Sequence, residues 1–119
     1  MMMMINRIEI LGTVGNVRFS SFEDRRNVNL SVVTNYIYKG RDSAPMMETM
    51  WFNVTGWEGK SISPETLDGL VKGCSVHVWG RMRERTYTLS DGIERHVTEI
   101  VANAMELVKD TDAFQPARA

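Results

Sequence analysis

Apolar and polar residues alternate along five segments of this chain, and a period of two is typical of a β-strand that is buried on one face. The five segments cover residues 5–14, 27–36, 48–57, 74–86 and 94–107. In the second segment Val28, Leu30 and Val32 share one face, while polar side chains occupy the other. This pattern limits the chain to folds built mainly from strands.

One short helix is predicted between the third and fourth strands. Ser63 suits the N-cap, Pro64 the first helical position and Glu65 the first turn. Apolar residues at helical spacing, then a cation and a glycine, complete the helix signal: Leu67, Leu70, Val71, Lys72 and Gly73. We expect the helix to end near Gly73.

The order of three strands, a helix and two strands predicts an all-β fold, a five-stranded Greek-key barrel of the OB type. Gly80 interrupts the fourth strand and favours the bend that barrel closure requires. A five-stranded α+β sheet with an open edge is the alternative. We expect residues 1–109 to form one domain and residues 110–119 to form a short disordered tail.

Composition narrows the class of protein. A chain of 119 residues that is 43% hydrophobic suits one folded domain, and it contains no apolar run of membrane-spanning length. Cys74 is the single cysteine, so an intrachain disulfide is excluded. His77 and His96 are too few to indicate a metal site. We expect a cytoplasmic protein with no membrane association, cofactor, metal or catalytic activity.

Charge is balanced overall but uneven along the sequence. The net charge is −1, and residues 1–109 hold 13 Lys and Arg against 13 Asp and Glu. Arg81, Arg83 and Arg85 nevertheless fall on one face of the fourth strand, with Glu84 as the only acidic residue between them. Such a stripe is either a solvated face or a local site for phosphates.

Aromatic residues also fall on faces opposite a predicted core. Trp51 and Trp57 share the face opposite Phe52 and Val54. On the fourth strand the odd positions are His77, Trp79, Arg81, Arg83, Arg85 and Tyr87, opposite Val76, Val78 and Met82. Flat side chains beside cations bind single-stranded nucleic acid without sequence preference, because every base has a π-face. The other interpretation is that these aromatics are buried in the core or in an interface.

Two loops are expected to flank the second strand. The polar stretch at residues 20–26 is predicted to be the first. The second, residues 39–47, follows Tyr36 and Tyr38 and carries Lys39 and Arg41.

Five motifs in order resemble the bacterial single-stranded-DNA-binding proteins. They are INRIEILGTVG, LSVVTN, ETMWFNVTGWEGK, LVKGCSVHVWGRMRERTY and DGIERHVTEIVANAMEL. In that family four aromatic positions stack bases, and the resemblance implies Tyr38, Trp51, Trp57 and Tyr87 for these roles here. It also implies a homotetramer, although a related dimeric OB protein of the primosome is closer in length.

The chain departs from that family at three places. It ends in DAFQPARA instead of an acidic tip, so we expect it to recruit replication and repair proteins poorly. The loop after the first strand reads SSFEDRRN, where the family usually has Pro and Gly. Trp79 stands where the family often has an acidic residue, and it could add stacking area or alter a subunit interface.

The sequence as a whole predicts a protein that binds and protects single-stranded DNA in replication, recombination and repair, at the nucleoid. The candidate contacts are Tyr38, Trp51, Trp57, Trp79, Tyr87, Lys39, Arg41, Arg81, Arg83 and Arg85. Two alternatives stay open. One is an OB-fold protein-interaction or primosome-type accessory subunit, and the other is an RNA-binding cold-shock-like role.

Overall fold

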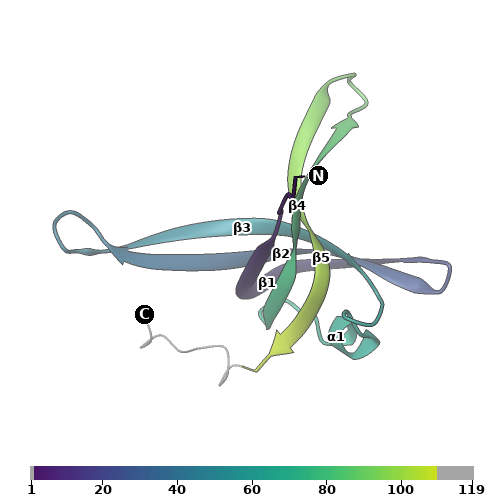
Figure 1. Cartoon of the computed structure of the whole chain (residues 1–119), viewed down its shortest axis with the longest axis horizontal. Coiled ribbons are helices and arrows are strands. Elements are labelled where there is room, and N and C mark those ends of the chain that lie inside the picture. The colour runs from purple at the N-terminus through teal and green to yellow at the C-terminus, as the bar shows by residue number, and fades with distance from the viewer. Residues whose placement is uncertain (1, 110–119) are drawn as a thin grey trace.

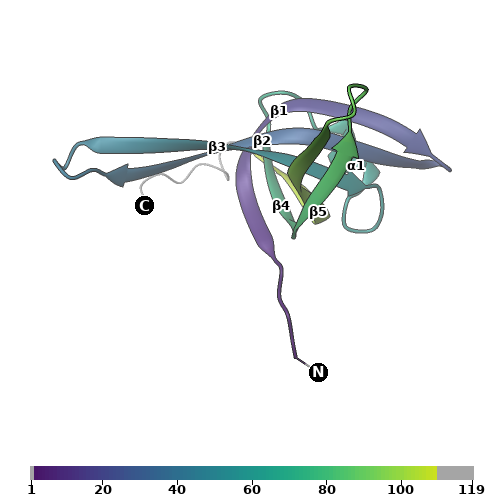
Figure 2. The same ribbon diagram turned by 90° about the horizontal axis from the view of Figure 1, so that it is seen from above.

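The computed structural model describes residues 2–109, which form one closed five-stranded barrel with strand order β1–β2–β3–β5–β4 (Figures 1 and 2). The elements are β1 (Ile8–Phe22), β2 (Arg25–Lys39), β3 (Pro45–Trp57), α1 (Pro64–Asp68), β4 (Ser75–Thr88) and β5 (Glu94–Val108). The predicted barrel with a helix between its third and fourth strands is confirmed. Closure makes the open-edged α+β alternative wrong. The tail predicted for residues 110–119 lies outside the described residues.

The core lies on the inward face that the alternation predicted. Val28, Leu30 and Val32 of β2 are at most 4% exposed, and they pair with Gly56, Val54 and Phe52 of β3. Val76 and Val78 of β4 are also buried, and Met82 packs against the same cluster. Because this register has no bulge, every odd position of β2 and β3 turns away from the core.

Gly80 allows β4 to cross closely over its neighbours. Its position pairs with Ile8 of β1 and, at a register shift, with Ala102 of β5. A Cβ at Gly80 would overlap the carbonyl oxygen of Val101. The irregularity expected at this glycine is therefore confirmed, although the additional residue of the bulge, Asn103, belongs to β5.

The first predicted loop is wrong. β1 continues to Phe22 and β2 begins at Arg25, so only Glu23 and Asp24 turn the chain, with φ values of 48° and 67°. Two central residues with positive φ match the twist of a tight hairpin. Polar residues in this segment lie on the strands of a hairpin that extends past the barrel (Figure 1), and residues 20–25 are all exposed. The second loop is also shorter than expected, since β3 already begins at Pro45.

Helix α1 begins as predicted and ends early. The backbone N–H of Thr66 donates to the Ser63 hydroxyl at 3.1 Å, and Leu67 is completely buried. The helix ends at Asp68, and the left-handed turn follows at Gly73, whose φ is 94°. Val71 is 57% exposed, so its predicted place on an apolar helix face is wrong. Within residues 2–109 the structure has no helix long and apolar enough to cross a membrane.

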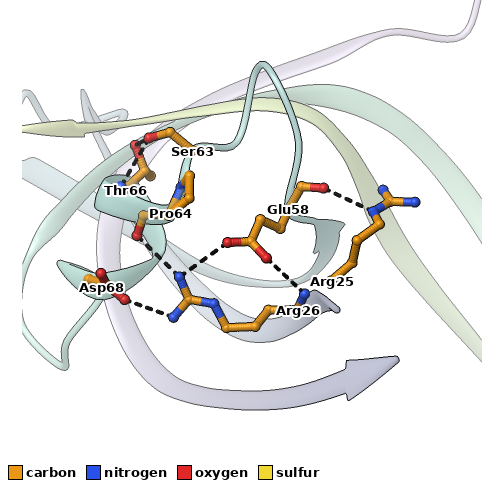
Figure 3. Close-up of polar contacts among 7 residues, drawn as sticks. All are labelled: Arg25, Arg26, Glu58, Ser63, Pro64, Thr66 and Asp68. Carbon is orange, nitrogen blue, oxygen red and sulfur yellow. Dashed lines mark hydrogen bonds and ion pairs between the residues drawn. The ribbon is translucent and has the colours of Figure 1, made fainter. Parts of the chain in front are cut away.

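Arg26 ties the β1–β2 hairpin to α1 and to the end of β3 (Figure 3). Its guanidinium donates to Asp68 at 2.7 Å, to the Pro64 carbonyl at 3.3 Å and to Glu58 at 3.4 Å. The hydrogen bond with Asp68 raises the pKa of Arg26 above its ordinary value, so the guanidinium stays protonated. The neighbouring Arg25 donates through Nε to the Glu58 carbonyl at 3.1 Å. This network fixes the hairpin relative to the barrel.

Replacing Gly80 with alanine should destabilise the protein by about 1–3 kcal/mol, because the added methyl group collides with backbone and not with a mobile side chain. Gly59→Ala is the matched control. The nearest atom to its added Cβ is 3.9 Å away, so the free energy of unfolding should change by less than about 0.5 kcal/mol. Urea denaturation measures both values. Equal stability of the two variants would contradict this account of β4.

Candidate nucleic-acid interface

Two open grooves run along the outer side of the barrel. The first has a volume of about 900 Å³ and lies between β1, the outer face of β2 and β3, and the β4–β5 hairpin. Its polar and aromatic lining includes Asn16, Arg18, Asn29, Ser31, Asn53, Arg85, Tyr87 and Glu99. The second, of about 630 Å³, is lined at its basic and aromatic positions by Arg25, Trp57, Lys60 and Arg83.

Trp51 and Trp57 lie on the same outer face of β3, as predicted. They are 58% and 44% exposed, and the positions between them carry Asn53 and Thr55. The Trp51 ring lies across β2 toward β1, beside Ser31 and so close to Gly15 that an added Cβ there would be 2.6 Å from its Cζ3. The two indoles thus mark the two ends of a polar strip along the sheet.

Arg25 stacks on Trp57, with its guanidinium carbon 5.2 Å from the ring centre. A cation over an indole face is attracted to the ring and helps to hold both side chains in place. Sequence reasoning missed Arg25, Arg18 and Lys60, which all line the grooves. Extending the odd-position pattern of β2 through residues 20–26 would have found Arg25. Placing Lys60 required the tertiary fold, because it follows β3 in a loop.

The arginines of β4 share one outer face, as the alternation predicted. Arg83 lines the second groove and Arg85 lines the first, together with Tyr87. Arg83 and Arg85 both contact Glu99, whose residue exposure is only 5%. Arg81 is exposed on the same face and has no ion pair within residues 2–109.

Tyr38 does not join the two tryptophans. It pairs with Met46 on the even-numbered face of the β2–β3 ladder, opposite the face of Trp51. There its ring stacks on Tyr36, with ring centres 6.0 Å apart. Lys39 and Arg41 lie at or next to the tip of the same hairpin and line neither groove. The structure therefore separates these three predicted residues from the groove aromatics.

Trp79 also lies outside both grooves. It pairs with Glu9 of β1 and Ala104 of β5, and its ring stacks on His77 at a centre-to-centre distance of 3.8 Å. His77 Nε2 is 2.6 Å from Glu9 Oε2. These contacts place Trp79 on the β1–β4 side of the barrel. Among residues 2–109, His, Cys, Asp and Glu side chains form no group of three that could hold a metal ion.

Comparison with known proteins gives consistent relatives. Residues 5–108 match the single-strand binding protein family. Proteins named single-stranded DNA-binding protein from Neisseria meningitidis serogroup A and Xanthomonas axonopodis pv. citri are 30% and 31% identical over 109 and 106 residues. These alignments cover 89% and 87% of this chain but 61% and 58% of the relatives. The chain thus spans about three fifths of their length.

A solved structure has the same fold. The Plasmodium falciparum SSB in complex with ssDNA superposes with a TM-score of 0.75 at 21% sequence identity. The superposition covers 90% of this chain and 96% of that one. At this identity the likeness is evidence for the barrel fold alone.

Gly15→Ala should displace the Trp51 ring from β1, because the new methyl group would occupy the position of its Cζ3 edge. In protein labelled with 5-fluorotryptophan, the three tryptophans give three fluorine resonances. We expect the Trp51 resonance to shift and those of Trp57 and Trp79 to keep their positions. Assignment uses single Trp→Phe variants. An unchanged Trp51 resonance would contradict the described packing.

Proposed function

The chain belongs to the single-strand binding protein family, and we propose that it binds and protects single-stranded DNA without sequence preference and without catalysing a reaction. The observation that carries the proposal is the pair of grooves in which exposed aromatic rings lie beside arginines and amide side chains. The proposed setting is replication, recombination and repair at the nucleoid. The relatives' names support this assignment.

Base stacking is the proposed source of affinity. Trp57 and Tyr87 each line a groove. Trp51 is not among the lining residues of either groove, but its ring approaches Gly15 at the same position as Ser31, which lines the first groove. These three residues are between 41% and 58% exposed, so a base can reach them without opening the core. Because a ring face accepts any base, stacking explains binding that is independent of sequence.

Phosphate contacts are the proposed second source. Arg18 and Arg85 line the first groove, while Arg25, Lys60 and Arg83 line the second. These cations line both grooves. A DNA backbone can therefore follow the grooves while its bases turn toward the outer face of the sheet. Binding of this type releases counterions, so the affinity should fall as the salt concentration rises.

Trp51→Ala should weaken binding of a long oligo-dT by about 1–3 kcal/mol, or about 5- to 150-fold, because one stacked base is lost. Tyr36→Ala serves as the control. It removes an exposed aromatic side chain from the opposite face of the β2–β3 ladder, outside both grooves and away from the proposed subunit contact, so the affinity should stay within about twofold of wild type. Quenching of tryptophan fluorescence measures both. Equal losses of affinity in the two variants would show that Trp51 does not stack a base. If DNA does not quench the fluorescence of the wild type, the protein-interaction alternative is favoured.

We also propose that the protein assembles as a homotetramer through surfaces outside the grooves. Leu11 is 43% exposed, and it pairs with His77 on the β1–β4 side, next to Trp79. An exposed leucine beside a stacked His–Trp pair suits a subunit contact. Recruitment of replication and repair proteins, which we expect to be poor, stays a prediction.

Sedimentation equilibrium should give a mass four times the 13.6 kDa of the chain. Leu11→Glu should lower that mass, because a charge would be buried at the proposed contact. Leu89→Glu, at a residue of similar exposure at the end of the β4–β5 hairpin, is the control and should leave it unchanged. A wild-type mass of 13.6 kDa would contradict self-association, and a mass twice that value would point to a dimer.

A further inference from the structure

Glu99 is a buried carboxylate at the junction of the two proposed DNA grooves. Its side chain is 6% exposed, whereas the side chains of Arg83 and Arg85 above it are 43% and 58% exposed. Arg83 lines one groove, while Arg85 and Glu99 line the other. One acidic group thus lies beneath two cations that a phosphate would meet.

The contacts to Glu99 are unequal. Arg83 donates from both Nε and Nη2 to the Oε2 oxygen, with the Nε contact at 2.9 Å. Arg85 makes a longer contact, with its Nη2 3.6 Å from Oε1. Arg25, the groove cation stacked on Trp57, has no ion pair within residues 2–109. The grooves therefore contain two kinds of arginine in the described part of the chain: Arg83 and Arg85, whose charge is partly neutralised by a carboxylate, and Arg25, whose charge is not.

The carboxylate of Glu99 lowers the net positive charge that a DNA phosphate would meet at Arg83 and Arg85. Two guanidinium groups and one carboxylate leave a net charge of +1. Because Glu99 is buried, salt screens its interactions less than those of a surface carboxylate. A phosphate drawn to Arg83 is at the same time repelled by Glu99.

We propose that Glu99 is a positioning residue that holds Arg83 and Arg85 at the groove and limits how strongly they bind phosphate. It cancels half of their combined charge while holding Arg83 at one groove and Arg85 at the other. The inference rests on the proposed function, since it assigns a role to Glu99 within the same DNA site. It explains why a buried acid of β5 lies beneath the basic stripe of β4.

Glu99→Gln tests the proposal, because the amide keeps an oxygen acceptor for Arg83 and removes the negative charge. Affinity for oligo-dT should rise several-fold at low salt. The plot of log affinity against log salt should become steeper by about 0.7, the value of one additional phosphate contact on a single strand. A merely structural role would lower the melting temperature and the affinity without steepening the slope. An unchanged or shallower slope would overturn the proposal.

Two further variants separate local from general charge effects. Glu106→Gln removes the same charge from an exposed position of β5 that pairs with His77 and lines neither groove, so its slope should match wild type. Glu99→Asp retains the carboxylate and should restore the wild-type slope. A steeper slope in Glu106→Gln as large as that in Glu99→Gln would overturn the local role.

The double variant Arg83→Gln/Glu99→Gln removes both members of the closest ion pair and leaves neither of them as an unpaired buried charge. It should lose the steeper slope of Glu99→Gln. If Glu99→Gln fails to fold, the double variant tests the proposal in its place. A slope about 0.7 shallower than wild type would then show that Arg83 binds phosphate independently of Glu99. Failure of the wild type to bind would overturn the proposed function and this inference together, whereas wild-type binding with an unaltered slope in Glu99→Gln would overturn this inference alone.

Discussion

The unbroken ladder between β2 and β3 is the constraint on which the rest of the structure depends. It runs from Asn27 paired with Trp57 to Lys39 paired with Pro45, without a bulge. A strand with a period of two keeps odd and even positions on opposite faces along its whole length. The ladder therefore packs Val28, Leu30 and Val32 into the core and turns Trp51 and Trp57 outward. The same rule turns Tyr38 to the other face, away from the grooves.

Closure of the barrel adds the second requirement, which is close approach between backbones. Gly80 meets this requirement on β4, where a side chain would strike the carbonyl of Val101, and Gly12 meets it on β1, where a side chain would strike the carbonyl of Val33. Closure brings β4 and β5 around to β1 and β3, and it leaves the hairpins to extend outward (Figure 2). The grooves form where these hairpins leave the barrel, so the proposed binding surface is a consequence of how the barrel closes.

Electrostatics in this protein is local. The described part of the chain carries nearly balanced charge, and its net charge gives no indication of a polyanionic ligand. The arrangement of the charges is more informative than their sum. Arg26 is used structurally, in contacts with Glu58 and Asp68, while Arg25 next to it stacks on Trp57 at a groove. Adjacent arginines thus serve different purposes because successive strand positions face opposite sides.

The resemblance of five motifs in order indicated the family. Short-range information in the sequence determined the central parts of the five strands, the core face, the Ser63 cap and the outward tryptophans. These features depend on periodicity and on local backbone chemistry, which neighbouring residues carry by themselves. Sequence alone placed Tyr38 and Trp79 with the other aromatics and missed Arg25. Only the tertiary structure decided which side of a hairpin faces a groove, that α1 stops before Val71, and that Glu99 lies beneath Arg83. Those outcomes depend on contacts between residues far apart in the chain, and such contacts produce no periodicity or motif within a short stretch of sequence.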